Sequence, residues 1–366
     1  MSSGRIRLGM VGGGQGAFIG GVHRIAARLD GRFDLAAGAL SSDPARAEAS
    51  ARELGLARSY DDFAHMAREE AARDDGIEAV AIVTPNHMHL PAARAFLEAG
   101  IHVICDKPLT ATLPEAEELA RVAEASDALF ILTHTYAGYP MVREARRLVA
   151  EGALGEIRVV QVEYAQDWLA REETGKQAEW RTDPARSGAG GAVGDIGSHA
   201  AHLARYVSGL AIESVAAQLT AFVPGRRVDD DTQALLRLSG GARGMLWASQ
   251  VAPGHDNDIR LRVLGSEAGL DWSHADPNRL RLTRLGEPSQ LLTRGGPGFD
   301  GAARIPAGHP EGYLEAFASL YSDAADAITS GVMPDGLPGL SDGLDGMRFI
   351  AACVSSSAED GKWVAC

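Results

Sequence analysis

Hydrophobic positions in the first third of the chain alternate between short apolar runs and longer stretches with helical spacing. Residues 6–11 form an apolar run, which passes through glycines into a segment whose apolar residues recur at helical spacing as far as Leu29. The alternation continues, with apolar runs at 35–40, 78–83, 102–105 and 128–133 and helical stretches at 41–55, 90–100 and 113–126. Strands that alternate with helices of this length predict right-handed β-α-β units. We therefore expect an α/β fold in which residues 1–136 form a Rossmann domain with a doubly wound parallel sheet.

The alternation of predicted strands and helices ends after a helical stretch at 141–155. Strand-like segments then follow one another across glycine-rich turns, and several of them alternate apolar and polar residues. They lie at 157–166, 212–222, 232–239, 243–251, 259–265 and 279–285. Successive strands without crossover helices favour antiparallel pairing. Residues 137–366 are thus expected to form an α+β domain with an open, largely antiparallel or mixed sheet, one face of which is covered by late helices at 312–331 and 342–360.

Composition and charge narrow the classes of partner. Hydrophobic residues make up 45% of the 366 positions, and no apolar stretch approaches the eighteen or so residues of a membrane span. A net charge of -14 opposes binding to nucleic acid and to anionic membranes, so a small-molecule substrate is expected. The first residues run into glycines within about ten positions, which predicts no signal peptide, and the cysteines at 105, 353 and 366 form no C-x-x-C pair. A cytoplasmic protein is the expectation.

The glycine turn after the first apolar run has the features of a dinucleotide site. Gly12 permits the tight turn, Gly14 lets the backbone approach a pyrophosphate, and the small Ala17 allows close packing of helix on strand. The start of the following helix faces the phosphates. A glycine-rich turn can also serve only to turn the chain, but its place at the first strand-helix junction favours nucleotide binding. The predicted cofactor residues here are Gly12, Gly14, Gln15, Gly16, Ala17, Phe18 and Ile19.

The end of the second predicted strand bears on the choice between NAD and NADP. Ser41, Ser42 and Arg46 could accept a 2′-phosphate, whereas Asp43 could bind a plain ribose. Alternatively, Ser42 or Asp43 only caps the next helix. The pattern slightly favours NADP.

Two further segments follow predicted strands at their carboxyl ends, where ligands bind in open α/β sheets. The first carries Thr84, Pro85, Asn86 and His89, which we assign to the cofactor, with a capped turn as the alternative. In the second, "HVICDKPLTAT" at 102–112, a buried strand ends in Asp106 and Lys107 before a proline, and both residues are also assigned to the cofactor site. Burying an ammonium group costs several kcal/mol or more unless the group is paired. Lys107 is therefore either solvated or held there for a function.

The segment "GGAVGDIGSHAAHLARYVSG" at 190–209 holds an acid and two histidines at helical spacing. Asp195 and His199 share one face if the segment is helical, and His202 follows three residues later. These residues could bind a metal, could form a general base oriented by Asp195, or could be satisfied core histidines. No soft ligands lie at suitable spacing elsewhere, so we predict no metal.

Together these segments resemble the glucose-fructose oxidoreductase, inositol dehydrogenase and MocA family. The 102–112 segment is similar to the family's Glu-Lys-Pro signature, and 190–207 is similar to its Gly-Gly-x-x-x-Asp-x-Gly-x-His signature. The resemblance implies a Rossmann domain that binds NAD(H) or NADP(H), a site for a sugar, inositol or related polyol, and a homodimer or homotetramer that packs its open sheets together. It maps the catalytic residues to Lys107, Asp195 and His199. Asp106 departs from the pattern, because glutamate is usual there.

Other pocket candidates carry weaker signals. His134 and Tyr136 follow the fifth predicted strand, and Trp180 with Arg181 would suit a sugar's apolar face and hydroxyls. Tyr164 is a further substrate candidate. Asp167 and His309 are possible pocket residues, and for most of these side chains ordinary packing or surface exposure is the alternative.

The resulting hypothesis is an NAD(P)-dependent dehydrogenase that acts on a ring hydroxyl or ketone of a sugar, glycoside or cyclitol. A nucleotide-binding sensor that lost catalysis is the alternative, since fold does not imply function. Hydride leaves a carbinol carbon only as the hydroxyl proton is removed, and a histidine has an ordinary pKa near 6.5. We assign His199 as general base, Asp195 as the group that orients it or binds a neighbouring hydroxyl, and Lys107 as the cation that stabilises alkoxide charge. Lys107 as base would require a lysine far more acidic than in water.

Overall fold

The computed structural model describes residues 4–299 and 301–366, which fold as two compact units. The first comprises the chain up to Thr135 together with Tyr313–Leu344, and the second comprises Tyr136–Gly312 and Asp345–Cys366. The predicted division after residue 136 lies next to the end of the first segment. The return of 313–344 to the first unit differs from the predicted continuous domain over 137–366.

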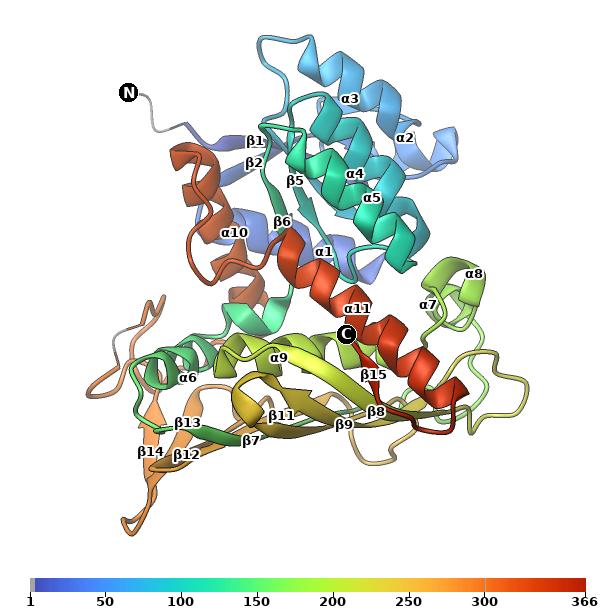
Figure 1. Cartoon of the computed structure of the whole chain (residues 1–366). Helices are drawn as coiled ribbons and strands as arrows, with labels where there is room; N and C mark the ends of the chain where they lie inside the picture. Colours follow the sequence, from blue (N-terminus) through green and yellow to red (C-terminus); the bar gives the residue numbers. More distant parts are fainter. Residues whose placement is uncertain (1–3, 300) are drawn as a thin grey trace. The chain divides into compact units, whose positions relative to one another are not determined.

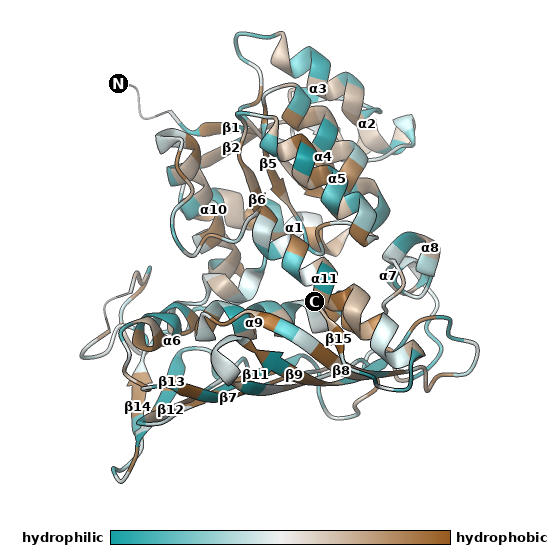
Figure 2. Cartoon of the chain, in the orientation of Figure 1, coloured by the Kyte–Doolittle hydropathy of each residue, from teal (hydrophilic) through white to brown (hydrophobic). Residues whose placement is uncertain are grey.

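The first unit is built on a parallel sheet with strand order β3-β2-β1-β4-β5-β6 (Figure 1). Its central strands are buried on both faces, which requires nearly continuous apolar residues. β4, for example, is buried at every position and reads AVAIV. Figure 2 shows these strands as largely hydrophobic. The strands are β1 (Ile6–Gly12), β2 (Phe33–Ala39), β3 (Arg58–Ser59), β4 (Ala79–Val83), β5 (His102–Cys105) and β6 (Phe130–Leu132). The predicted doubly wound sheet is confirmed.

Capping residues fix where several helices of this unit begin. The Asp43 and Asp62 carboxylates accept hydrogen bonds from backbone amides of the helices they precede, and Thr112 forms a capping box with Glu115. The helices are α1 (Phe18–Leu29), α2 (Pro44–Glu53), α3 (Phe63–Ala71), α4 (His89–Glu98) and α5 (Leu113–Glu124). Of these, α3, α4 and α5 pack side by side in sequence order. α3 was missed from the sequence.

The late helix α10 (Tyr313–Ser330) belongs to the first unit and packs against α1, whereas the sequence-based prediction assigned it to the second sheet. The reason is an aromatic cluster in the first unit. The His23 ring lies 5.0 Å from Phe317, its Nδ1 is 2.8 Å from the Tyr321 hydroxyl, and Tyr321 stacks edge-on against Phe33. α11 (Leu340–Ala358) contributes its first residues to the same unit.

The second unit carries a mixed sheet with strand order β14-β13-β12-β11-β7-β10-β9-β8-β15. β7 and β10 pair in parallel and the other strand pairs described in this sheet are antiparallel, in agreement with the predicted open, mixed sheet. Buried and exposed residues alternate along β9 from Thr232 to Leu238, and Figure 2 shows the same alternation of colours in this sheet. The strands are β7 (Ile157–Ala165), β8 (Ile212–Thr220), β9 (Asp231–Leu238), β10 (Arg243–Ser249), β11 (Asp258–Gly265), β12 (Ala268–Ser273), β13 (Arg279–Arg284), β14 (Gln290–Thr293) and β15 (Val364–Ala365).

Helices cover one face of this sheet. α6 (Pro140–Ala150) and α9 (Ser198–Ser208) pack against each other and against sheet strands, while α7 (Lys176–Arg181) and α8 (Pro184–Ser187) are short. Two α11 residues, Ser356 and Ser357, accept hydrogen bonds from β8 amides. Within residues 4–299 and 301–366, no helix has both the length and the apolar character needed to cross a membrane.

Candidate active site

The predicted glycine turn lines a pocket of the first unit. Residues 13–18 form its wall with Arg24, Ser50, Glu53 and Leu54, and it encloses ≈ 380 Å³. The backbone at Gly12 has φ +77°, and a Cβ there would lie 2.9 Å from the Val83 carbonyl oxygen, so the turn requires glycine. The Gln15 amide donates to the Ser50 hydroxyl, and its side chain donates to Glu53. Phe18, 66% exposed, and the half-buried Ile19 open α1 beside the pocket.

The residues proposed to choose between NAD and NADP lie at the start of α2. Asp43 caps this helix, since its carboxylate accepts from the Arg46 amide at 2.9 Å, and its own amide donates to the Ser41 hydroxyl. The side chains of Ser42 and Arg46 are exposed. Asp43 therefore has the helix-capping role that was the alternative to ribose binding. The Arg46 side chain points to solvent on the first turn of the helix.

At the carboxyl end of β4, His89 holds the neighbouring turn. The imidazole is buried, with Nδ1 2.8 Å from the Pro108 carbonyl oxygen and Nε2 3.0 Å from that of Thr84. Burial lowers the pKa of His89, opposed by the Asp106 carboxylate. His89 thus acts through the backbone, beside the buried Asn86 and the half-buried Pro85.

Thr84 supplies an observation that fits a bound nucleotide. Its hydroxyl is buried and has no hydrogen-bond partner among the described residues, and its methyl group lies 3.0 Å from where a Gly12 Cβ would stand. Buried polar atoms are nearly always satisfied, so such a hydroxyl fits a site that a polar ligand completes. The glycine turn and this hydroxyl together fit a dinucleotide.

The half-buried Lys107 follows β5 on a turn fixed from two sides. The Asp106 carboxylate accepts from the Lys107 amide at 2.9 Å and from the Thr133 hydroxyl at 3.2 Å, and His89 holds the Pro108 carbonyl. The shorter acid at position 106 therefore keeps an anchoring role. Nearby, His134 is buried beyond the end of β6.

In the second unit, Asp195 and His199 stand at the start of α9. A π-helical turn, Val193–Gly197, precedes the helix, and such turns occur frequently at functional sites. His199 is 8% exposed and packs edge-on against the Tyr136 ring at 5.1 Å. The buried His202 stacks on Tyr206, and burial, with Arg205 and His199, places its pKa well below the ordinary value. Of the metal, general-base and core interpretations of this segment, the core interpretation describes His202.

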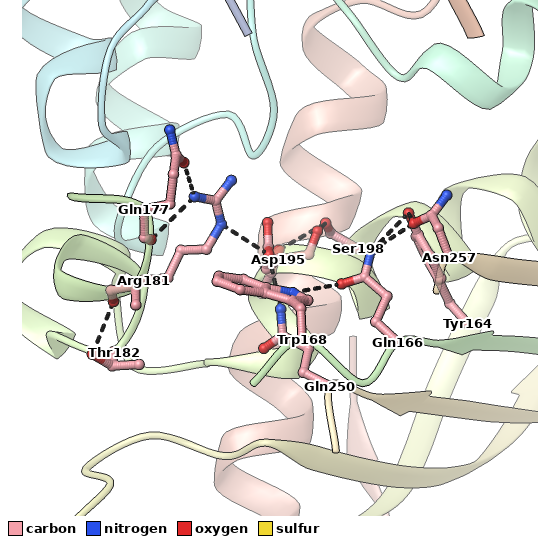
Figure 3. A network of polar contacts seen from close by, with 12 residues as sticks. Tyr164, Gln166, Trp168, Gln177, Arg181, Thr182, Asp195, Ser198, Gln250 and Asn257 are labelled. Carbon is pink, nitrogen blue, oxygen red and sulfur yellow. Dashed lines mark hydrogen bonds and ion pairs between the residues drawn. The ribbon is translucent and has the colours of Figure 1, made fainter. Parts of the chain in front are cut away.

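The Asp195 carboxylate is held by two donors, as Figure 3 shows. Arg181 Nε donates to Oδ2 at 3.1 Å, and Gln250 Nε2 donates to the same oxygen at 2.9 Å. Arg181 is itself fixed, since its guanidinium lies over the Trp180 ring at 4.3 Å and donates to the Gln177 side chain. The predicted substrate residues Trp180 and Arg181 thus form a support for Asp195. Sequence reasoning missed Gln250, which reaches the site from the end of β10.

A second polar network includes Tyr164, Gln166 and Asn257 (Figure 3), and the Tyr164 ring lies 6.1 Å from the His199 ring. The Tyr136 hydroxyl donates to that of Tyr164 at 2.7 Å, and Tyr164 donates to Asn257 Oδ1 at 2.7 Å. Asn257 also accepts from Gln166, which accepts from Trp168 Nε1. Burial raises the pKa of Tyr136 to about 12, so this hydroxyl stays protonated near neutral pH. Tyr136 and Tyr164 form a packed wall behind the histidine.

The two remaining pocket candidates, Asp167 and His309, lie outside these networks. Asp167 is half-buried and accepts from the Gly254 amide, and His309 is exposed. Within the described ranges, no group of three or more His, Cys, Asp or Glu side chains could hold a metal ion.

The pocket at the glycine turn in one unit and the acid-histidine pair on the second, sheet-based unit fit the oxidoreductase class, and comparisons with known proteins identify the family. Residues 6–146 match the model described as the oxidoreductase family with an NAD-binding Rossmann fold, and residues 142–271 match the GFO/IDH/MocA C-terminal domain. The chain is 35% identical to the uncharacterized oxidoreductase YfiI of Bacillus subtilis, over 98% of this chain and 96% of that protein.

Solved structures extend the likeness over almost the entire chain. An oxidoreductase from Sinorhizobium meliloti is 52% identical, with a TM-score of 0.90 and 99% of each chain covered. An inositol dehydrogenase homologue from Azotobacter vinelandii in complex with NAD+ is 38% identical, with a TM-score of 0.94, covering 99% of this chain and 97% of that one. An inositol dehydrogenase homologue from Azotobacter vinelandii was also solved with NADH and myo-inositol. The chain belongs to the Gfo/Idh/MocA family of NAD(P)-binding oxidoreductases.

Proposed function

We propose that this protein is a dehydrogenase that oxidises a ring hydroxyl of a sugar, glycoside or inositol-like polyol, or reduces the corresponding ketone. The observation that carries the proposal is the fixed Asp195 carboxylate one helical turn from His199. An acceptor held in place beside a histidine suits recognition of neighbouring hydroxyls on a ring. The myo-inositol complex of the Azotobacter homologue supports this substrate class.

Each of three side chains has a separate chemical role in the proposal. His199 removes the proton of the reacting hydroxyl, Asp195 orients the histidine or binds an adjacent hydroxyl, and Lys107 stabilises the negative charge that develops on the oxygen. The nicotinamide of the bound cofactor supplies the hydride acceptor or donor. Residues Gly12–Ala17 and Thr84 would hold the dinucleotide, and the packed Tyr136 and Tyr164 rings keep the histidine in a defined orientation.

For the cofactor, we infer that either nucleotide is accepted, with NADP slightly favoured. Ser42 and Arg46 are exposed at the start of α2, where a guanidinium can bind a 2′-phosphate. Relatives of both kinds support this breadth: the Azotobacter homologue was solved with NAD+, and a related Bacillus subtilis protein is named as an NADP+-dependent scyllo-inositol dehydrogenase. The cysteines are free thiols, which suits the proposed cytoplasmic location.

For assembly, we propose a homodimer or homotetramer that uses the outward face of the second unit's sheet. Leu235 and Met245 are directly paired across β9 and β10, and they are 54% and 46% exposed. A hollow of ≈ 730 Å³ follows this face, which Gln161, Gln233 and Trp247 also line. Exposed apolar residues adjacent on a sheet favour burial against another protein surface.

Substitution of the two candidate bases tests the assigned chemistry. Loss of general-base assistance costs about a hundredfold to ten-thousandfold in rate. His199→Ala should therefore lower kcat by that amount and leave nucleotide binding nearly unchanged, and Lys107→Met should also abolish most turnover. If His199→Ala keeps near-normal turnover and an unchanged pH profile while Lys107→Met is inactive, the lysine is the base.

A further inference from the structure

An aspartate outside the family signatures holds the start of the segment that bears Asp195 and His199. Asp229 is 7% exposed and lies two residues before the start of β9. Its carboxylate oxygens accept from the Gly191 amide at 2.6 Å and the Val193 amide at 2.8 Å, and its carbonyl oxygen accepts from the Ala192 amide at 2.9 Å. The amides of three successive residues thus donate to one residue, which lies 36 or more positions later in the chain.

These amides lie just before and at the first residue of the π-helical turn. The first amides of a helix have no partner within the helix, and a carboxylate at that end also interacts favourably with the helix dipole. Asp195 comes two residues after Val193, and its own amide donates to the Gly191 carbonyl at 2.9 Å. The position of the Asp195 backbone is therefore set by the same short segment that Asp229 holds.

The fit between Asp229 and this segment leaves little freedom. A Cβ at position 191 would lie 2.0 Å from the Asp229 carbonyl oxygen, so a side chain there would push the two segments apart. The carboxylate is further fixed by the Thr232 hydroxyl, which donates to it at 2.8 Å. Burial raises the pKa of Asp229, opposed by the hydrogen bonds from Val193, Gly191 and Thr232.

We infer that Asp229 is a positioning residue: it fixes the start of the π-turn and α9 so that Asp195 and His199 are presented in a productive arrangement. This inference rests on the proposed function, because it assigns a purpose to the geometry of the same acid-histidine pair. Displacement of a catalytic group by about 1 Å can cost a hundredfold in rate. Asp229 itself needs no contact with substrate.

The neighbouring Asp230 provides a matched control. It is also buried, at 0% exposure, and its carboxylate also accepts from two backbone amides, those of Phe222 and Val223, and from Arg226. These partners lie in the loop that follows β8. Asp230→Asn and Asp229→Asn each replace a buried carboxylate that holds two backbone amides, but only the Asp229 carboxylate holds the segment before α9.

The experiment compares both variants in the full-length protein by two readouts. The first is kcat, substrate KM and nucleotide affinity, and the second is hydrogen exchange at the backbone amides of residues 191–195. Asp229→Asn should lower kcat about tenfold to a hundredfold with nucleotide affinity unchanged, and should accelerate exchange at these amides. Asp230→Asn should stay within about threefold of the parent in kcat and leave these amides protected.

Several outcomes would overturn the inference. Parent-like kcat in Asp229→Asn, unchanged exchange at 191–195, or equal kcat losses in both variants would each do so. If the parent protein turns over no polyol, the proposed function fails, while the exchange readout still decides whether Asp229 fixes the segment. If Asp229→Asn cannot be obtained folded, Thr232→Val, which removes one donor to the carboxylate, should accelerate exchange at the same amides, and parent-like exchange there would contradict the inference.

Discussion

Arg181 and Gln250 donate to the same oxygen of Asp195, at 3.1 Å from Nε and 2.9 Å from Nε2. The arginine reaches this carboxylate from α7 and is steadied by the Trp180 ring beneath its guanidinium. An acid held in this way is a fixed acceptor, and the proposed mechanism therefore assigns the movement of the proton to His199.

Removal of Arg181 should therefore weaken catalysis through Asp195. A hydrogen bond to a charged group contributes about 1.5–3 kcal/mol, which corresponds to roughly tenfold to a hundredfold in kcat/KM. Arg181→Ala should show this loss with nucleotide affinity unchanged, and Arg181→Lys should recover only part of it because lysine lacks the planar fork. Arg186→Ala, in the neighbouring helix α8, is the control and should behave as the parent in the same steady-state assay.

Cofactor choice is tested at the start of α2. Arg46→Ala should reduce affinity for NADP much more than affinity for NAD, because only NADP offers a 2′-phosphate to the guanidinium. Binding is measured by titration of each nucleotide. Arg52→Ala, later in the same helix and paired with Glu48, should change neither affinity. Equal losses for the two nucleotides in Arg46→Ala would place this side chain outside the 2′-phosphate site.

Much of the fold was readable from the sequence because its determinants are local. The passage from an apolar strand through glycines into α1, and the alternation along β9, follow from hydrophobic period and turn chemistry. α3 was missed in a strongly charged stretch, although Asp62 caps it. The docking of α10 on α1 could not be read from its apolar face, because that face does not specify the partner surface.

The candidate site was predicted only where it lies in a contiguous motif. Lys107, Asp195 and His199 stand in short signatures, whereas two of the groups that hold the segment around Asp195 lie far along the chain, next to β9 and β10. Gln250 contacts Asp195 across 55 positions, and the Asp229 carboxylate reaches Gly191 across 38. No local spacing signals such contacts, because they depend on how β9 and β10 are placed beside α9.

Acid should destabilise the first unit through His23. This imidazole is fully buried, and burial is the main cause that lowers its pKa to about 4, opposed by Asp106. The unfolded chain binds a proton near pH 6.5 while the folded protein does not, so stability is complete above that pH and is lost as pH falls toward 4. The loss from this group reaches at most about 3 kcal/mol.

The measurement is the free energy of unfolding by urea as a function of pH. His23→Gln, which keeps a polar group facing Tyr321, should flatten the decline between about pH 6.5 and 4 relative to the parent. His65→Gln, at an exposed position on α3, should leave the decline unchanged. The same decline in His23→Gln as in the parent would show that other groups control acid sensitivity.

A single charge introduced on the outward sheet face should disrupt assembly through that face. Leu235→Arg places a cation among the exposed apolar residues of β9 and β10, and it should convert the oligomer to smaller species in a sedimentation experiment at micromolar concentration. Leu285→Arg, at a turn position that is 81% exposed, is the control and should sediment as the parent. A parent protein that is monomeric at this concentration would refute the proposed assembly.

The most direct test of the proposed function is turnover by the parent protein. The protein is incubated with NAD+ or NADP+ and a broad panel of sugars, glycosides and inositols, and nicotinamide absorbance is followed. The proposed function predicts reduction of the nucleotide with at least one cyclic polyol, and loss of this reduction in His199→Ala. Tight nucleotide binding without turnover across the panel would contradict the proposed function and would instead indicate a nucleotide-binding sensor on the same fold.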